Sequence, residues 1–199
     1  MRSLRSELRR RPVSLRVADP RRVHEVYALL RSLGIASLVK LAGEGVEVPG
    51  SVLAARRRDA VLAAWIALCL EGGARPLLGV DLGLRNVGVA VLVGDVVAYT
   101  GVVRGLREVV ELAADLLELG AGLRVRVGYT RSWRGVADAL ASKLGAMGAE
   151  VELVPEEEAR REVVVGDFAG FARKLSPHEL DALRIALHPK RYINERGPR

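Results

Sequence analysis

The clearest pattern of apolar and polar positions lies in the middle of the chain. Three apolar runs lie at 76–80, 87–93 and 96–103. The first two are separated by Asp81 and a five-residue turn at 82–86, and the last two by Gly94-Asp95. Short apolar runs bounded by turn residues are typical of buried strands, and Gly-Asp between two of them indicates a tight hairpin. The pattern therefore predicts a three-stranded β-meander, around which the rest of the chain is organised.

After the meander, helical and extended patterns alternate. Apolar residues at helical spacing predict a helix at 106–119, followed by a strand at 123–127. A second helix and strand follow at 133–147 and 151–154, and a capping box at 176–179 begins a final helix. This order predicts an α/β fold with a mixed five-stranded sheet and helices on its faces.

The first 74 residues predict a smaller α+β unit. Asp19-Pro20 is a favourable helix start, and the apolar stripe that follows ends at Gly34. A second helix is expected at 56–70 and short strands at 13–17, 35–40 and 46–48, while residues 1–11 are a basic arm or a short helix. We therefore divide the chain into a small module at 1–74, a main domain at 75–190 and a basic tail at 191–199.

The composition indicates the class of protein and the cellular compartment. Half of the residues are hydrophobic, so the chain can bury a core, and no apolar run approaches the roughly 20 residues of a membrane span. A single cysteine, Cys69, and the lack of a visible signal peptide favour a reducing cytoplasm. Gln is absent and Arg greatly outnumbers Lys, which fits a thermophile.

The positive charge is unevenly distributed. Residues 1–75 hold fourteen basic and seven acidic residues, so the whole net charge of +7 lies in this part of the chain. A basic unit beside a neutral one favours a polyanionic partner such as DNA or RNA.

Candidate chemistry centres on Asp81, which ends the first strand of the meander and is followed by a Gly-containing turn. A carboxylate fixed at a strand end suits Mg²⁺, although a plain turn aspartate is the alternative. His178 and Asp181 are three residues apart in the final helix and therefore share one face, which can meet Asp81 if that helix packs across the sheet. A carboxylate from the stretch that follows the fifth strand would complete an acidic pocket.

Four segments carry a resemblance to a known family: residues 79–90, 127–130, 154–157 and 178–186. The first holds an Asp followed by Gly at the second position and again five further on, and the last holds a His three positions before an Asp. In this order they resemble the ribonuclease H-like superfamily, and most closely its RuvC and YqgF group of Holliday-junction resolvases and RNA-processing nucleases. The resemblance covers about residues 76–190.

The resemblance implies a metal-dependent endonuclease that acts on branched DNA or structured RNA. Its catalytic residues would be Asp81, Glu156, His178 and Asp181, and the three carboxylates would hold Mg²⁺ or Mn²⁺ in a two-metal hydrolysis of the phosphodiester. Junction resolvases need two active sites, so a homodimer is also implied. We expect phosphate contacts from Arg56, Arg57 and Arg58 at the start of the second helix, and from Arg85 and Arg131 in loops of the main domain.

Three positions depart from the family pattern. Where RuvC enzymes have a Glu at the end of the fourth strand, this chain has Val127-Gly128-Tyr129. Pro155-Glu156-Glu157 stands where YqgF proteins have Asp-Glu-Arg, so Glu156 replaces the Glu by register, with Glu157 as the alternative. Asn86, beside Arg85, replaces a basic residue. A non-catalytic nucleic-acid-binding protein of the same fold is therefore an open alternative. The first motif also resembles the phosphate loop of actin-type and sugar-kinase phosphotransferases, which need two such domains.

Overall fold

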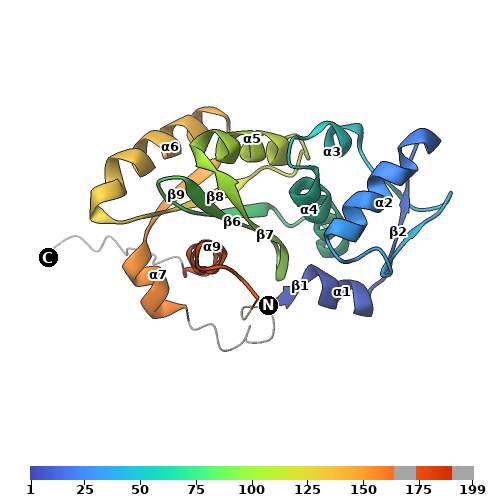
Figure 1. Cartoon of the computed structure of the whole chain (residues 1–199), viewed down its shortest axis with the longest axis horizontal. Coiled ribbons are helices and arrows are strands. Elements are labelled where there is room, and N and C mark those ends of the chain that lie inside the picture. The colour runs from blue at the N-terminus through green and yellow to red at the C-terminus, as the bar shows by residue number, and fades with distance from the viewer. Residues whose placement is uncertain (164–173, 190–199) are drawn as a thin grey trace, which may run out of the picture.

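A mixed six-stranded sheet forms the centre of the computed structural model, which describes residues 1–163 and 174–189 (Figure 1). β6 is antiparallel to its neighbours β5 and β7, whereas β8 and β9 continue the sheet parallel to β5. The predicted α/β class with a mixed sheet is confirmed. The strands, in sheet order, are β1 (Arg2–Ser3), β7 (Val96–Arg104), β6 (Asn86–Val93), β5 (Pro76–Asp81), β8 (Arg124–Tyr129) and β9 (Glu150–Pro155).

The sheet has six strands rather than the five predicted. The additional strand is β1, whose two residues pair in parallel with Val96 and Val97 of β7. Residues 1–11 are therefore not a free arm: β1 is followed at once by helix α1 (Leu4–Arg10), which buries Leu4 and Leu8. The predicted tail at 191–199 lies outside the described residues.

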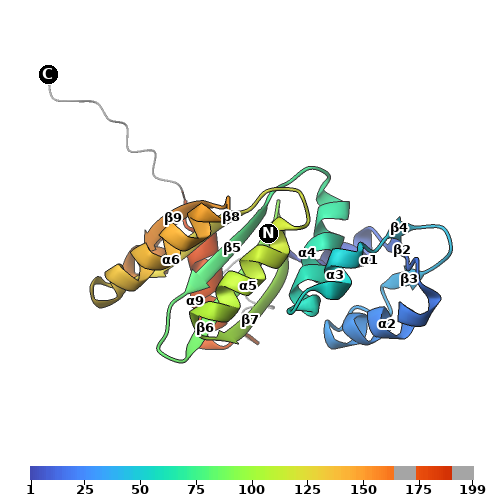
Figure 2. The ribbon, with the colours of Figure 1, turned by 90° about the horizontal axis from the view of Figure 1, so that it is seen from above.

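Helices cover both faces of the sheet (Figure 2). One face packs against α4 (Arg58–Glu71), α5 (Gly105–Leu117) and α6 (Arg134–Ala146), and the other against α9 (Pro177–Leu187). Every residue of β5 is buried as a result, which explains its unbroken apolar sequence up to Asp81. None of the helices in the described parts of the chain is long and apolar enough to span a membrane.

Two glycines allow α9 to lie directly on the sheet. A Cβ atom at Gly79 of β5 would overlap the backbone carbonyl of Ala182, and one at Gly88 of β6 would overlap the carbonyl of His178. Both glycines belong to the first motif of the sequence. Their lack of a side chain therefore sets the distance between α9 and the strand that ends in Asp81.

The N-terminal residues form a small parallel sheet in the order β3 (Val39–Leu41), β2 (Val13–Arg16), β4 (Val46–Glu47), with η1 (Pro20–Arg22), α2 (Val23–Ser32) and α3 (Gly50–Ala54) beside it. α4 packs against both α2 and the large sheet, and one buried cluster runs from Leu4 to Ala149. The predicted strand at 35–40 was too early by four residues, and α3 was not expected. The two units therefore share a hydrophobic core.

Two elements of the main domain differ from expectation. β8 extends through Tyr129, two residues beyond the end of the predicted strand at 123–127. Helix α7 (Glu156–Glu162) directly follows β9, whereas the residue pattern indicates only an irregular or partly helical stretch that begins at Ala159. These differences matter because both lie at the edge of the sheet where Asp81 ends β5.

Candidate functional site

Four predicted site residues meet at the carboxyl ends of the parallel strands β5 and β9. Asp81 is the last residue of β5, and Glu156 directly follows β9 as the first residue of α7. His178 and Asp181 come from the first turns of α9, which crosses the sheet above β5 and β6. The structure thus brings together the predicted catalytic residues from three distant parts of the chain.

Asp81 is 4% exposed and is held by a direct contact with α9. Its Oδ2 lies 2.8 Å from Nδ1 of His178, whose side chain is partly open to solvent. Burial raises the pKa of Asp81, and the nearby charge of Asp181 adds to this effect, while the hydrogen bond to His178 and the charge of Arg160 oppose it. Burial therefore favours the neutral form of the Asp81 carboxyl group, whereas a bound cation would favour the charged form.

Glu156, rather than Glu157, belongs to this cluster. Glu156 is 6% exposed, and its pKa is raised first by burial and then by the charges of Asp81 and Asp181, against the opposing effect of Arg160. Glu157 is exposed and lines a separate surface cavity of about 510 Å³, which Tyr129 and Arg131 also line. The two glutamates that the sequence left as alternatives therefore have different surroundings.

Asp181 is held by two arginines that the sequence interpretation did not include. Its Oδ2 accepts a hydrogen bond from Arg160 at 2.8 Å, and its Oδ1 accepts one from Arg184 at 3.0 Å. Arg160 also lies 3.5 Å from Oε2 of Glu156, so its guanidinium bridges two carboxylates of the cluster. The available signal was spacing, because Arg160 follows Glu156 by four residues and Arg184 follows Asp181 by three.

The donor set fits a divalent cation only in part. Asp81 and Glu156 are buried carboxylates that repel each other, which is the situation a bound Mg²⁺ or Mn²⁺ relieves. Asp181 already has a positively charged partner on each oxygen. Among the residues that the structure describes, the one trio of ligand atoms within 4.8 Å of one another lies elsewhere. Arg160 therefore supplies part of the charge that a metal ion would supply.

The five predicted phosphate-binding arginines separate into two groups. Arg56 and Arg57 form ion pairs with Glu111 and Glu108 of α5, and Arg58 pairs with α2, all on the side of the sheet opposite α9. Arg85 and Arg131 are exposed, and they follow β5 and β8 at the edge that holds the acidic cluster. The structure therefore brings only this second pair to the same edge as Asp81.

No protein-family model and no curated protein matches this chain. The fold and the geometry of the cluster are therefore the observations from which a function can be inferred.

Proposed function

We propose that this chain is a metal-dependent endonuclease of the ribonuclease H-like type, acting on branched DNA or structured RNA. The observation that carries the proposal is the meeting of two buried carboxylates, Asp81 and Glu156, beside Asp181 and His178 at one edge of the sheet. The strand order β7-β6-β5-β8-β9, with β6 antiparallel, and the α9 helix across it support the same assignment.

A purely structural role for this cluster is disfavoured by its energetics. Burying carboxylates near one another costs free energy, and the structure compensates only partly, through Arg160 and His178. Groups held in such an unfavourable arrangement at a strand end are typical of sites that bind a cation or perform proton transfer. Asp81 and Glu156 would hold Mg²⁺ or Mn²⁺, and the bound ion would activate water and stabilise charge on a scissile phosphate.

His178 has a position suited to proton transfer. Asp81 engages its Nδ1, so Nε2 is the ring nitrogen that remains for a proton exchanged with water or with a leaving oxygen. Arg85 and Arg131, exposed after β5 and β8 at the same edge of the sheet, would attract the phosphate backbone toward the carboxylates.

The test is cleavage of labelled four-way junctions, flaps and RNA hairpins in the presence of Mg²⁺ or Mn²⁺. We expect wild-type protein to cut at least one of them weakly and Asp81→Asn to lose the activity, because the amide keeps the shape but removes the charge. Asp138→Asn, the same change at an exposed position of α6, is the matched control and should cut as well as wild type. Equal cleavage by Asp81→Asn, or none by wild type, would exclude the nuclease.

A non-catalytic nucleic-acid-binding protein is the second candidate, and one observation favours it. Both oxygens of Asp181 are occupied by arginines, and β8 ends in Gly128-Tyr129 without a carboxylate. Binding of the same junctions and hairpins without cleavage, together with no Mn²⁺ binding that depends on Asp81, would establish this alternative.

A further inference from the structure

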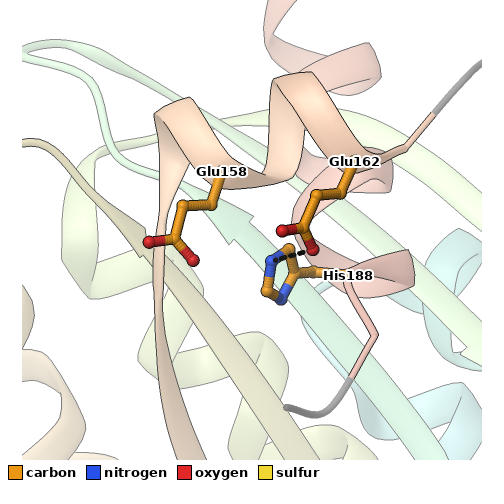
Figure 3. Close-up of side chains that lie close together, drawn as sticks. All are labelled: Glu158, Glu162 and His188. Carbon is orange, nitrogen blue, oxygen red and sulfur yellow. Dashed lines mark ion pairs between the residues drawn. The ribbon is translucent and has the colours of Figure 1, made fainter.

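A second cluster of potential metal ligands lies between α7 and the end of α9. Glu158 and Glu162 are one helical turn apart on this helix, and His188 directly follows the end of α9. One ligand atom from each of the three residues lies within 4.8 Å of the other two. Figure 3 shows both glutamates projecting from α7 on the side that holds the His188 ring.

His188 is fixed in place by a buried arginine. Arg126 of β8 donates hydrogen bonds to the carbonyl oxygens of His188 and Ala186, and its Nε donates to Glu152 at 2.9 Å. The backbone N–H of His188 caps α9 by donating to Ile185. The backbone of His188 is therefore held in place, and the residue is only 6% exposed.

The imidazole nitrogen that faces the glutamates lacks a hydrogen bond. Nε2 of His188 is fully buried and has no hydrogen-bond partner within the described ranges, although Oε2 of Glu162 lies only 3.2 Å away. A hydrogen bond requires the N–H to point at its acceptor, whereas two metal ligands both point at a third position. Ligand atoms in a tetrahedral zinc site, with bonds of about 2.0–2.1 Å, are about 3.3 Å apart, close to the observed separation.

We propose that Glu158, Glu162 and His188 bind a divalent transition-metal ion, with Zn²⁺ as the best fit. An imidazole with two carboxylates suits Zn²⁺ better than Mg²⁺, which prefers oxygen ligands. Three protein ligands leave one tetrahedral position for water. The site shares no residue with the acidic cluster and does not depend on the proposed nuclease activity.

A bound ion would join two elements that contribute to the acidic cluster. α7 carries Glu156 and α9 carries Asp181, and the zinc ligands come from the same helix and from the residue after α9. Zn²⁺ would therefore fix α7 against the end of α9 and restrict their relative movement.

The first test uses metal-stripped wild-type protein and ZnCl₂. The chain contains three histidines, so their imidazole signals can be followed individually by NMR. We expect one equivalent of Zn²⁺ to shift the His188 signals and to leave those of His24 unchanged. His188 signals that do not move at saturating Zn²⁺ would overturn the proposal, and so would a shift confined to His178.

The second test measures Zn²⁺ affinity by calorimetry in three glutamate and aspartate variants. Glu162→Gln should weaken binding by more than about tenfold, as expected for loss of a ligand. Glu157→Gln, the same change at an exposed neighbour on α7, should have no effect. Asp81→Asn should also retain the affinity, which separates this site from the acidic cluster. Zn²⁺ binding that survives Glu162→Gln unchanged, or that disappears in Asp81→Asn, would contradict the assignment.

Discussion

Nδ1 of His178 lies 2.8 Å from Oδ2 of Asp81, although 97 residues separate them in the sequence. This contact exists because α9 lies almost directly on β5 and β6, with Gly88 beneath the backbone of His178. Gly88 thus helps to position the side chains of the site, because its lack of a Cβ atom lets α9 approach the sheet.

The first prediction concerns Gly88→Ala. A methyl group here would meet the His178 carbonyl, so α9 must move away from the sheet, and we expect the free energy of unfolding to fall by about 1–3 kcal/mol. Gly145→Ala is the control, because its Cβ would meet nothing within 4 Å in α6, and it should stabilise by up to about 1 kcal/mol. Chemical denaturation measures both changes. Equal stabilities of Gly88→Ala and wild type would show that the close approach of α9 is not required.

The second prediction is a pH-dependent gain in stability for Asp81→Asn. Burial raises the pKa of Asp81 in the folded chain, so the protonated form is the one that folding favours. The stabilising contribution is fully present below the pKa of the unfolded chain and is lost as pH rises through the folded pKa. Without metal, Asp81→Asn should therefore be more stable than wild type at pH 7, and the difference should shrink toward acidic pH.

Thermal unfolding of the metal-stripped proteins between pH 7 and acidic pH measures the difference in stability between Asp81→Asn and wild type. Adding Mn²⁺ should stabilise wild type at pH 7 more than it stabilises Asp81→Asn, since protons and the metal compete for the Asp81 carboxylate, which the variant lacks. A wild type that is more stable than Asp81→Asn at every pH would mean that Asp81 is satisfied without a cation.

Several parts of the site could be predicted from the sequence. Asp81 ends an apolar run before a turn, and His178 and Asp181 have the spacing of one helical face after a capping box, which the structure contains. These signals depend only on residues that are close in the sequence, so they can be recognised without knowledge of the tertiary structure. The choice between Glu156 and Glu157 was not local, because only the packing of α7 decides which glutamate is buried.

Other features depend on contacts that local patterns do not encode. The alternation of residues in β8 predicts that Arg124 and Arg126 point toward solvent, but this prediction is wrong for Arg126, which is 8% exposed beneath the end of α9. A charged residue is buried here because Glu152 and two carbonyl oxygens satisfy it. β1 was missed for a similar reason, since two residues paired with β7 carry no periodic signal.

The third prediction is that Arg160 competes with a metal ion. Its guanidinium bridges Glu156 and Asp181, so Arg160→Gln should free Glu156 and one oxygen of Asp181. Because a nearby positive charge is removed, Mn²⁺ binding should tighten by about tenfold. Arg161→Gln, an exposed neighbour on α7, removes the same charge without this bridge. Electron paramagnetic resonance of bound Mn²⁺ gives both affinities. Equal tightening in the two variants would indicate a general charge effect rather than competition at the cluster.

The last prediction concerns which arginines bind nucleic acid. Arg85 and Arg131 are exposed at the edge that holds the acidic cluster, whereas Arg56 and Arg58 are engaged in ion pairs with α5 and α2. Each phosphate contact that is lost should reduce the slope of log K against log salt by about one. We therefore expect the double variant Arg85→Gln, Arg131→Gln to lower the slope for a DNA junction by about two. The matched double variant Arg56→Gln, Arg58→Gln removes the same charge and should change the slope by less. Because α4 belongs to the shared core and β1 pairs with β7, such substitutions test the basic N-terminal unit without the loss of structure that its deletion would cause. A larger effect of the Arg56 and Arg58 pair would move the binding surface to that unit.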